Sequence, residues 1–369
     1  MWGRRFAAVA TAATVATAGV VSVAAPASWA GWQGEPIVAD VNGDGIADRN
    51  TLGLLPGSSD CRVMVNLGLA GGGFGPAQSY SYVSLPAGET NCPDMGVGLN
   101  LDGDAPRELA VTWFGGPPPT VPSTLLALDN FQVSGGFDTI FQPSYIGPAD
   151  FNGDQLLDIY EWTDQGEGFA TYLNNGTGML APGPVKYCSG RPQYELADFD
   201  RNGAMDVALA YLEGCGAFFA GVVVVLDNGT VIDLHGDVYG DSTWTVEVVD
   251  ANNDQIPDAL THNEVTGANT TFIGSGNGTF LPAPRAVRDY PNVSGVKASG
   301  IPVLANDFAT ARTKVTIVTP PRYGTVQVTT SRTIIYRPAK SHARTDRFVY
   351  RLTEDGKTSN ATVSLKVIG

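Results

Sequence analysis

Histidine is scarce in this chain, since only His235, His262 and His342 occur in 369 residues. The three lie in different parts of the sequence, and neither a G-x-S-x-G nor an H-E-x-x-H motif is present. Hydrolytic catalysis needs a nucleophile or metal, a general base and oxyanion donors that converge on one point. We therefore predict that the chain is not an enzyme. A secreted hydrolase of polysaccharides or phosphate esters is retained as an alternative.

Long apolar runs are missing after residue 30, because no later segment approaches 18 uninterrupted apolar residues. Within residues 1–30, Arg4 and Arg5 precede a stretch rich in Ala, Thr and Val, and small residues surround Trp29 at its end. This pattern is typical of a secretory signal peptide, and we expect cleavage after Ala30. A membrane anchor is the alternative, although the run is weakly apolar for a stable span. The sequence thus predicts a secreted, extracellular protein with no membrane span.

Basic residues are rare in most of the chain. Residues 31–284 hold 32 acids and 6 bases, a net charge of −26, whereas residues 285–369 hold 5 acids and 14 bases, a net charge of +9. A change in composition this sharp predicts a domain boundary near residues 283–288. Proteins that bind nucleic acids neutralise phosphates with Lys and Arg, so we expect no nucleic-acid partner for the acidic part.

Cysteine is limited to four residues, Cys61, Cys92, Cys188 and Cys215. An even number in an exported chain predicts disulfides, and four cysteines allow three connectivities. We favour the pairs that are local in sequence, Cys61 with Cys92 and Cys188 with Cys215, each of which closes a loop of about 30 residues. A zinc site is the alternative, but no C-x-x-C pair supports it.

An acidic motif recurs through the first 284 residues. DVNGDGIAD begins at residue 40, a looser copy NLDGDAPRE begins at 100, and DFNGDQLLD, DFDRNGAMD and DANNDQIPD begin at 150, 198 and 250, giving steps of 60, 50, 48 and 52 residues. Apolar, strand-like runs follow the loops, and Gly-rich or Asn-Gly turns come next. A period near 50 indicates repeated supersecondary units. We predict an all-β fold with three or four strands in each unit.

The recurring loops carry oxygen-bearing side chains at positions 1, 3, 5 and 9, while position 7 can offer its backbone carbonyl. Calcium takes six to eight oxygen ligands of these kinds. Fifteen carboxylates in five loops of an acidic domain also repel one another, and bound cations would relieve that repulsion. We expect three to five calcium ions. The predicted ligands are Asp40, Asn42, Asp44, Ile46 and Asp48; Asn100, Asp102, Asp104 and Glu108; Asp150, Asn152, Asp154, Leu156 and Asp158; Asp198, Asp200, Asn202, Ala204 and Asp206; and Asp250, Asn252, Asp254, Ile256 and Asp258.

Position 6 of each loop must turn sharply after the third carboxylate or amide. Gly45 and Gly203 permit this turn, whereas Gln155 and Gln255 replace glycine in the third and fifth loops. The second loop has Ala105, followed by Pro106, in place of that glycine, so we expect it to bind calcium least well. Asp, Asn and Gly are also common in ordinary turns, but five loops in one register favour a metal site.

An EF-hand is the competing calcium motif. It requires a Glu at position 12 and flanking amphipathic helices. Only the third loop has this residue, Glu161, and the segments around every loop have strand character. We therefore reject the EF-hand.

The pairing of D-x-N-x-D-G-x-x-D loops with a downstream G-x-G-x-F-x-x-P turn, seen from Gly276 to Pro282 and loosely from Gly72 to Pro76, resembles FG-GAP or VCBS repeat proteins. That family builds β-propellers related to the integrin α-subunit head, with calcium in the blade hairpins. The resemblance covers residues 31–284. It implies a calcium-binding β-propeller, with five blades favoured and six or seven as alternatives.

The segment 285–369 alternates strand-like runs with Pro and Gly turns, which is typical of a β-sandwich. Its order of motifs, VLAND, P-x-x-G-T-V, Y-x-P and D-x-F-x-Y-x-x-x-D-G, resembles bacterial immunoglobulin-like or cadherin-like domains. These motifs occupy Val303 to Asp307, Pro321 to Val326, Tyr336 to Pro338 and Asp346 to Gly356. The resemblance implies an Ig-like β-sandwich that follows the propeller.

Two groups of residues are candidates for partner binding. Trp113, Trp162, Tyr211 and His262 stand four or five residues past position 9 in different repeats and are candidates for a recognition ring; packing between repeats is the alternative. The predicted ligand is an extracellular glycan or protein, in an adhesion or ligand-binding role, with a non-catalytic scaffold of the cell envelope as the alternative. Six bases are candidates for binding anionic cell-wall polymer, with a solvated strand face as the alternative: Arg332, Arg337, Lys340, Arg344, Arg347 and Arg351.

Overall fold

The computed structural model describes residues 32–368 except for 56, 105–107, 165–167, 191–192, 213–219, 237–242, 340–343 and 355. The predicted signal peptide, Ala105, Cys215 and Lys340 therefore lie outside the described residues. Apart from one 3-10 turn, η1 (Val303–Asn306), all described elements are β-strands. Among these residues, no helix has the length and apolar character needed to cross a membrane.

Residues 37–282 form five antiparallel sheets of four strands each, and each sheet is a simple meander. The first contains β1 (Ile37–Ala39), β2 (Asp48–Leu54), β3 (Asp60–Asn66) and β4 (Gln78–Ser84), and the second contains β5 (Met95–Leu99), β6 (Glu108–Thr112), β7 (Leu125–Asp129) and β8 (Gln132–Phe137). The third contains β9 (Tyr145–Ala149), β10 (Asp158–Trp162), β11 (Phe169–Asn174) and β12 (Leu180–Tyr187), and the fourth contains β13 (Gln193–Ala197), β14 (Asp206–Tyr211), β15 (Gly221–Val225) and β16 (Val231–Gly236). The fifth contains β17 (Trp244–Val249), β18 (Asp258–Asn263), β19 (Asn269–Gly274) and β20 (Phe280–Pro282).

Successive sheets pack face to face, and this packing explains the sequences of their middle strands. In β6 and β15 every residue is buried, because each strand has a neighbouring sheet on both sides. A strand covered on both faces reads as a continuous apolar run instead of an alternating one. Separate apolar clusters fill the spaces between sheets one and two, two and three, three and four, and four and five.

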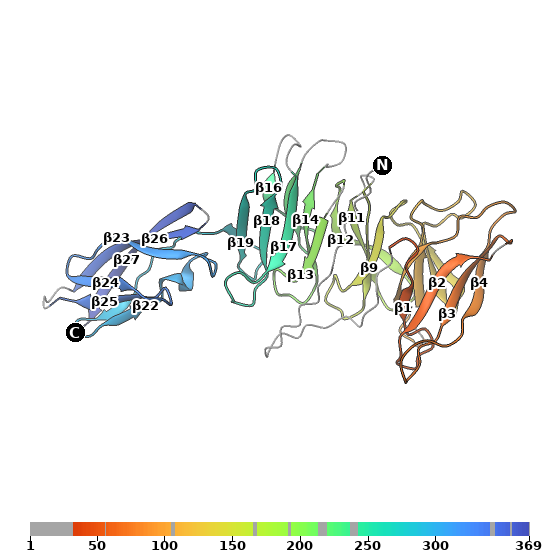
Figure 1. Ribbon diagram of the computed structural model, residues 1–369, viewed down its shortest axis with the longest axis horizontal. Helices are drawn as coiled ribbons and strands as arrows, with labels where there is room; N and C mark the ends of the chain where they lie inside the picture. The colour runs from red at the N-terminus through yellow and green to blue at the C-terminus, as the bar shows by residue number, and fades with distance from the viewer. Residues whose placement is uncertain are drawn as a thin grey trace.

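The five sheets form an open row in the structure, and the expected closed propeller is not seen. At three of the four junctions the first strands lie against each other: β1 with β5, β5 with β9, and β13 with β17. The first and fifth sheets lie far apart along the row, with the other three between them (Figure 1). The sequence repeat specifies the four-stranded unit, but closure depends on the angle between neighbouring sheets, which no local motif encodes.

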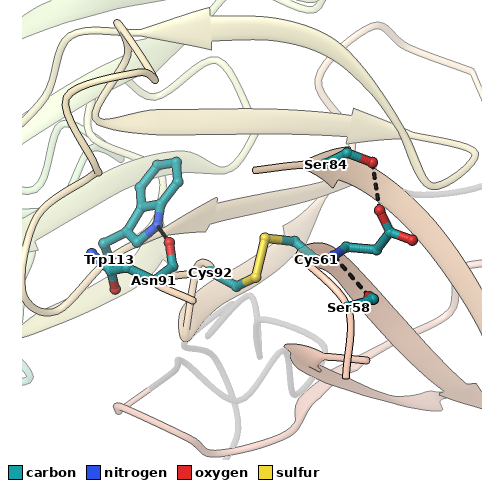
Figure 2. The surroundings of a disulfide bond; sticks show 7 residues. Ser58, Cys61, Ser84, Asn91, Cys92 and Trp113 are labelled. Carbon is teal, nitrogen blue, oxygen red and sulfur yellow. Dashed lines mark hydrogen bonds between the residues drawn. A yellow bond between two sulfur atoms is a disulfide. The ribbon is translucent and has the colours of Figure 1, made fainter. Parts of the chain in front are cut away.

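A disulfide joins the first two sheets. Cys61 of β3 is bonded to Cys92, which precedes β5, with a Cα–Cα distance of 5.4 Å. Beside it, the indole Nε1 of Trp113 donates a hydrogen bond of 2.9 Å to the backbone oxygen of Asn91 (Figure 2). The predicted pairing of Cys61 with Cys92 is therefore confirmed. Cys188 is also disulfide-bonded, whereas Cys215 is not among the described residues.

The carboxy-terminal part is a two-sheet sandwich. One sheet has the order β21 (Asn292–Ser294), β27 (Lys357–Ile368), β26 (Thr345–Glu354) and β23 (Lys314–Thr319), and the other has the order β22 (Ser299–Ile301), β25 (Ile334–Pro338) and β24 (Gly324–Val328). Their inner faces enclose a core that includes Tyr336, Phe348 and Tyr350, each at most 1 % exposed. The predicted β-sandwich is thus seen.

The sandwich lies against the fifth sheet, at the end of the row (Figure 1). The backbone N–H of Ala311 donates to the backbone oxygen of Ala251 at 2.9 Å, and Lys357 Nζ donates to Thr270 Oγ1 at 2.9 Å. The two oppositely charged parts of the chain therefore touch.

Candidate metal-binding loops

Every acidic loop connects the first strand of its sheet to the second. Position 1 follows the first strand directly and position 9 opens the second strand, so all five loops occupy equivalent places in their sheets. Position 6 takes the left-handed conformation where it is described, with φ of 82° at Gly45, 71° at Gln155, 95° at Gly203 and 66° at Gln255. Both glutamines therefore make the turn that glycine makes elsewhere, at a conformational cost of about 1 kcal/mol each.

The carboxylate at position 1 organises the backbone of its own loop. Asp40 Oδ1 accepts the N–H of Gly43 at 2.8 Å, and Asp40 Oδ2 accepts the N–H of Gly45 at 2.7 Å. In the third loop, Asp150 accepts the N–H groups of Gly153 and Gln155 at 2.7 and 2.9 Å. Asp198 and Asp250 accept loop N–H groups in the same way. These bonds hold the exposed carboxylates and amides of positions 1, 3 and 5 close together at the surface.

Position 9 has a structural role that the sequence analysis missed. Asp48, Asp158, Asp206 and Asp258 are each 0 % exposed. One oxygen of each accepts the N–H of loop position 2, and the other accepts an N–H at the end of the third strand or two residues beyond it. The donor pairs, at 2.7 to 2.9 Å, are Val41 and Gly68 for Asp48, Phe151 and Asn174 for Asp158, Phe199 and Asp227 for Asp206, and Ala251 and Gly274 for Asp258. We call this arrangement the position-9 clasp.

Burial of the clasp carboxylates raises their pKa. The pKa of Asp206 rises to about 7, and the pKa of both Asp158 and Asp258 rises to about 6. Loss of water around the charge is the largest cause in each case, and the backbone N–H bonds oppose it. The carboxylates at positions 1, 3 and 5 add to the effect by repelling the buried charge, which a cation in the loop would offset.

The second loop departs from this pattern. Glu108, 2 % exposed, accepts the N–H of Leu101 through Oε2 at 2.6 Å, but its Oε1 has no hydrogen-bond partner among the described residues. Carboxylate oxygens of Asp102, Asp104 and Glu108 lie within 4.8 Å of one another. Burial raises the pKa of Glu108 to about 7, and contact with Asp102 raises the pKa of Asp104.

The fourth loop brings together a similar trio. Carboxylate oxygens of Asp198, Asp200 and Asp206 also lie within 4.8 Å of one another. Burial and the nearby charge of Asp227 raise the pKa of Asp200. Each trio provides three carboxylate oxygens at the spacing of ligands around one cation, and among the described residues this grouping is found in these two loops.

Neighbouring sheets support each other's loops. The backbone N–H of Met205 in the fourth loop donates to the oxygen of Asp150 in the third at 2.8 Å. The N–H of Gly178, in the turn between β11 and β12, donates to the oxygen of Leu101 in the second loop at 2.8 Å. Asn174 Nδ2 donates to the oxygen of Asn100 at 2.7 Å. The Gly-rich turns between third and fourth strands therefore help to position the acidic loop of the preceding sheet.

The four candidates for a recognition ring lie in different surroundings. Trp113 is 1 % exposed and belongs to the core between sheets one and two. Trp162 packs edge-on against Trp32, with ring centroids 5.9 Å apart, and Tyr211 packs on Tyr187 at 5.3 Å. His262 Nδ1 lies 2.7 Å from Asn269 Oδ1. Among the described residues, no ring contact joins two of the four, and the three aromatic side chains pack within and between sheets.

The five predicted basic residues that the structure describes, all but Lys340, do not form one patch. Arg337 lies on the outer face of the β22-β25-β24 sheet, whereas Arg347 and Arg351 lie on the outer face of the opposite sheet. Arg332 Nη1 donates to the backbone oxygen of Thr310 at 2.6 Å. Closeness in sequence misled here, because the chain passes from one sheet to the other between β25, which carries Arg337, and β26, which carries Arg347 and Arg351.

Comparison with known proteins identifies part of the chain. Residues 281–366 match the family described as bacterial Ig domain. No curated protein matches the chain. Among solved structures, an endo-fucoidan hydrolase variant of glycoside hydrolase family 107 is similar at 13 % sequence identity and a TM-score of 0.19, over 91 % of this chain and 42 % of that one. The chain thus spans less than half of that structure, and a likeness this low carries no argument about function.

Proposed function

We propose that this protein is a secreted, calcium-binding adhesion or ligand-binding module, in which calcium stiffens the acidic loops of a row of sheets that ends in an Ig-like domain. The observation that carries the proposal is the pair of carboxylate trios in the second and fourth loops, each within 4.8 Å. Three carboxylates at this spacing repel one another, and a divalent cation would turn the repulsion into attraction. Each sheet is a meander with an acidic loop after its first strand. This arrangement supports the proposal that each sheet is one FG-GAP or VCBS repeat.

The donor set fits calcium. Carboxylate, amide and backbone carbonyl oxygens are the ligands of this hard cation, and no thiol or imidazole is present in the five loops. Positions 1, 3 and 5 would supply the exposed oxygens and position 7 a carbonyl. In the fourth loop these are Asp198, Asp200, Asn202 and Ala204, and a clasp oxygen of Asp206 completes the trio. Bound calcium would supply charge neutralisation and a fixed loop geometry.

The sequence predicted that the second loop binds calcium least well, whereas we propose that it is among the first to bind. Its position 6 has no glycine, yet its Glu108 keeps one buried oxygen without a hydrogen-bond partner among the described residues. A buried, unpaired carboxylate oxygen is costly, and a cation would satisfy it. We place calcium in the second and fourth loops first and in the other three with lower affinity.

A role in binding rests on the architecture. A row of rigid sheets with an Ig-like domain at its end presents long, stiff surfaces, which suits adhesion to an extracellular glycan or protein. A scaffold of the cell envelope is the alternative. Catalysis is not part of the proposal, because the carboxylates occur in one repeated register and because His235 and His262, the two histidines in the row, belong to different sheets.

A glycan array probed with the full mature chain, with calcium and with EDTA, tests the binding role. Binding to a glycan that requires calcium supports the adhesion module. An empty array together with a protein captured in pull-downs supports the scaffold, and hydrolysis of a polysaccharide that is lost on changing one acid outside the loops would contradict both.

A further inference from the structure

A basic face covers one side of the Ig-like sandwich. Side chains alternate along a strand, so the register of the β21-β27-β26-β23 sheet decides which residues point away from the core. Phe348, Tyr350 and Leu352 of β26 are buried, and the residues between them point outward. Strand pairing extends this outer face to the two neighbouring strands, β23 and β27, because Arg351 is opposite Thr316 of β23 and Arg347 is opposite Ser364 of β27.

Four cations lie on this face, and we call them the basic line: Lys314, Arg347, Arg351 and Lys366. All four are exposed. Lys366 is paired with Thr345 and is therefore the diagonal neighbour of Arg347, and Lys314 is paired with Thr353 and is the diagonal neighbour of Arg351.

Diagonal neighbours on one sheet face are about 7–8 Å apart. Arg347 and Arg351 are four residues apart on one strand, which is about 13 Å. The basic line therefore crosses three strands obliquely as two pairs of cations. Its length suits an extended polymer better than a compact ligand.

No acidic side chain offsets the basic line. On the outer face of these four strands, the described residues include no Asp or Glu, since Asp346 and Glu354 point inward. Asp346 accepts backbone N–H groups there, and Glu354 pairs with Arg312. Within the described part of the chain no ion pair involves any of the four cations, and Arg351 Nε donates instead to Asn360 Oδ1 at 2.9 Å. The four charges are thus available to an external anion.

The rest of the face favours a sugar polymer over a nucleic acid. The side chains between the cations are mostly short and polar, Thr316, Thr353, Asn360, Thr362 and Ser364, and the apolar side chains on this face include Val349 and the exposed Ile368. Hydroxyl and amide groups can exchange hydrogen bonds with sugar hydroxyls. Proteins that bind single-stranded nucleic acids on a sheet use aromatic side chains to stack bases, and the described residues of this face include none.

We propose that the basic line binds an anionic polysaccharide, with Arg347 and Arg351 at its centre. This interaction does not depend on calcium in the acidic loops. Residues 31–284 have a net charge of −26 and residues 285–369 a net charge of +9, so an anionic polymer is repelled by the acidic row and is attracted at the Ig-like domain.

The test uses the full mature chain in EDTA and measures retention and affinity on heparin, on neutral dextran and on single-stranded DNA. We expect binding to heparin alone at low salt. The double variant Arg347→Gln/Arg351→Gln should lose at least tenfold in affinity, and its plot of log affinity against log salt should be shallower by about 1.5. Both side chains point to solvent, so thermal unfolding should be unchanged.

The matched control is Arg337→Gln, compared with the single variant Arg351→Gln; it removes an exposed cation on the outer face of the opposite sheet. Its heparin affinity should stay within about twofold of the unmodified chain. An equal loss in the control would show that only net charge matters, and would overturn the proposal. Absence of heparin binding, or tighter binding to DNA than to heparin, would overturn it as well.

Discussion

The position-9 clasp and the exposed loop carboxylates should respond differently to the same chemical change. We compare two variants of the third loop. Asp158→Asn changes the clasp carboxylate, and Asp154→Asn changes the carboxylate at position 5. Asp158 is fully buried and accepts the N–H groups of Phe151 and Asn174, both at 2.7 Å. Asp154 is exposed and bonds only within its loop, to Asn152 and Leu156.

The expected cost follows from the geometry. Asn at 158 keeps one acceptor and points its NH₂ group at the other N–H, so one buried donor loses its partner, at about 1–3 kcal/mol. The remaining bond changes from charged to neutral, which costs about 1 kcal/mol more. Removal of a buried charge offsets part of this, since burial raises the pKa of Asp158 to about 6. We expect Asp158→Asn to lower the free energy of unfolding by about 2 kcal/mol.

Urea unfolding followed by tryptophan fluorescence is the assay, because every tryptophan of the chain precedes residue 285 and so reports on the row of sheets alone. In EDTA, Asp158→Asn should be destabilised and Asp154→Asn should change by less than about 0.5 kcal/mol. In about 5 mM calcium, the free energy of unfolding of Asp154→Asn should also be lower than that of the unmodified chain. Equal stability of Asp158→Asn and the unmodified chain in EDTA would refute the clasp.

Three further predictions concern other parts of the chain. The Cys61→Ala/Cys92→Ala variant should lose about 3–4 kcal/mol in the same urea assay, because the disulfide closes a loop with a sequence separation of 31; no loss would mean that it constrains little. In the Ig-like domain, burial raises the pKa of both Asp289 and Asp307 to about 6, so the folded state binds more protons than the unfolded state between about pH 4 and 6, and stability should fall as pH rises through that window. Asp289→Asn should weaken this dependence of stability on pH, measured by hydrogen exchange of the backbone amides of β26 and β27. An unchanged pH profile would contradict the assignment of the raised pKa to Asp289. Gln155→Gly should raise stability by about 0.5–1 kcal/mol, because φ there is 71°, and a loss would contradict that conformation.

Local patterns in the sequence predicted much of the fold. The acidic motif placed five hairpins, and its period indicated a repeated unit of three or four strands, which the structure shows to be four; both signals depend on residues near each other in the chain. The local pairing of Cys61 with Cys92 was also correct. The motifs from Val303 to Gly356 indicated the β-sandwich that the comparison with known families supports.

The features that the sequence did not reveal depend on contacts between distant residues. Asp206 matches a ligand position in the motif, and its bond to the N–H of Asp227 appears only when β14 and β15 are paired. Lys314 and Lys366 join Arg347 and Arg351 through strand register, although they stand far apart in sequence. The open row likewise depends on the angles between sheets.

Calcium binding is the central claim, and isothermal titration of the full mature chain with calcium tests it most directly. We expect three to five ions, with the tightest sites lost in a variant that combines Asp102→Asn, Asp104→Asn, Asp198→Asn and Asp200→Asn. With a Kd of about 0.1 mM, each occupied site adds about 1.4 kcal/mol to stability in about 1 mM calcium. A titration without heat of binding, together with a melting temperature that is the same in calcium and in EDTA, would contradict the account.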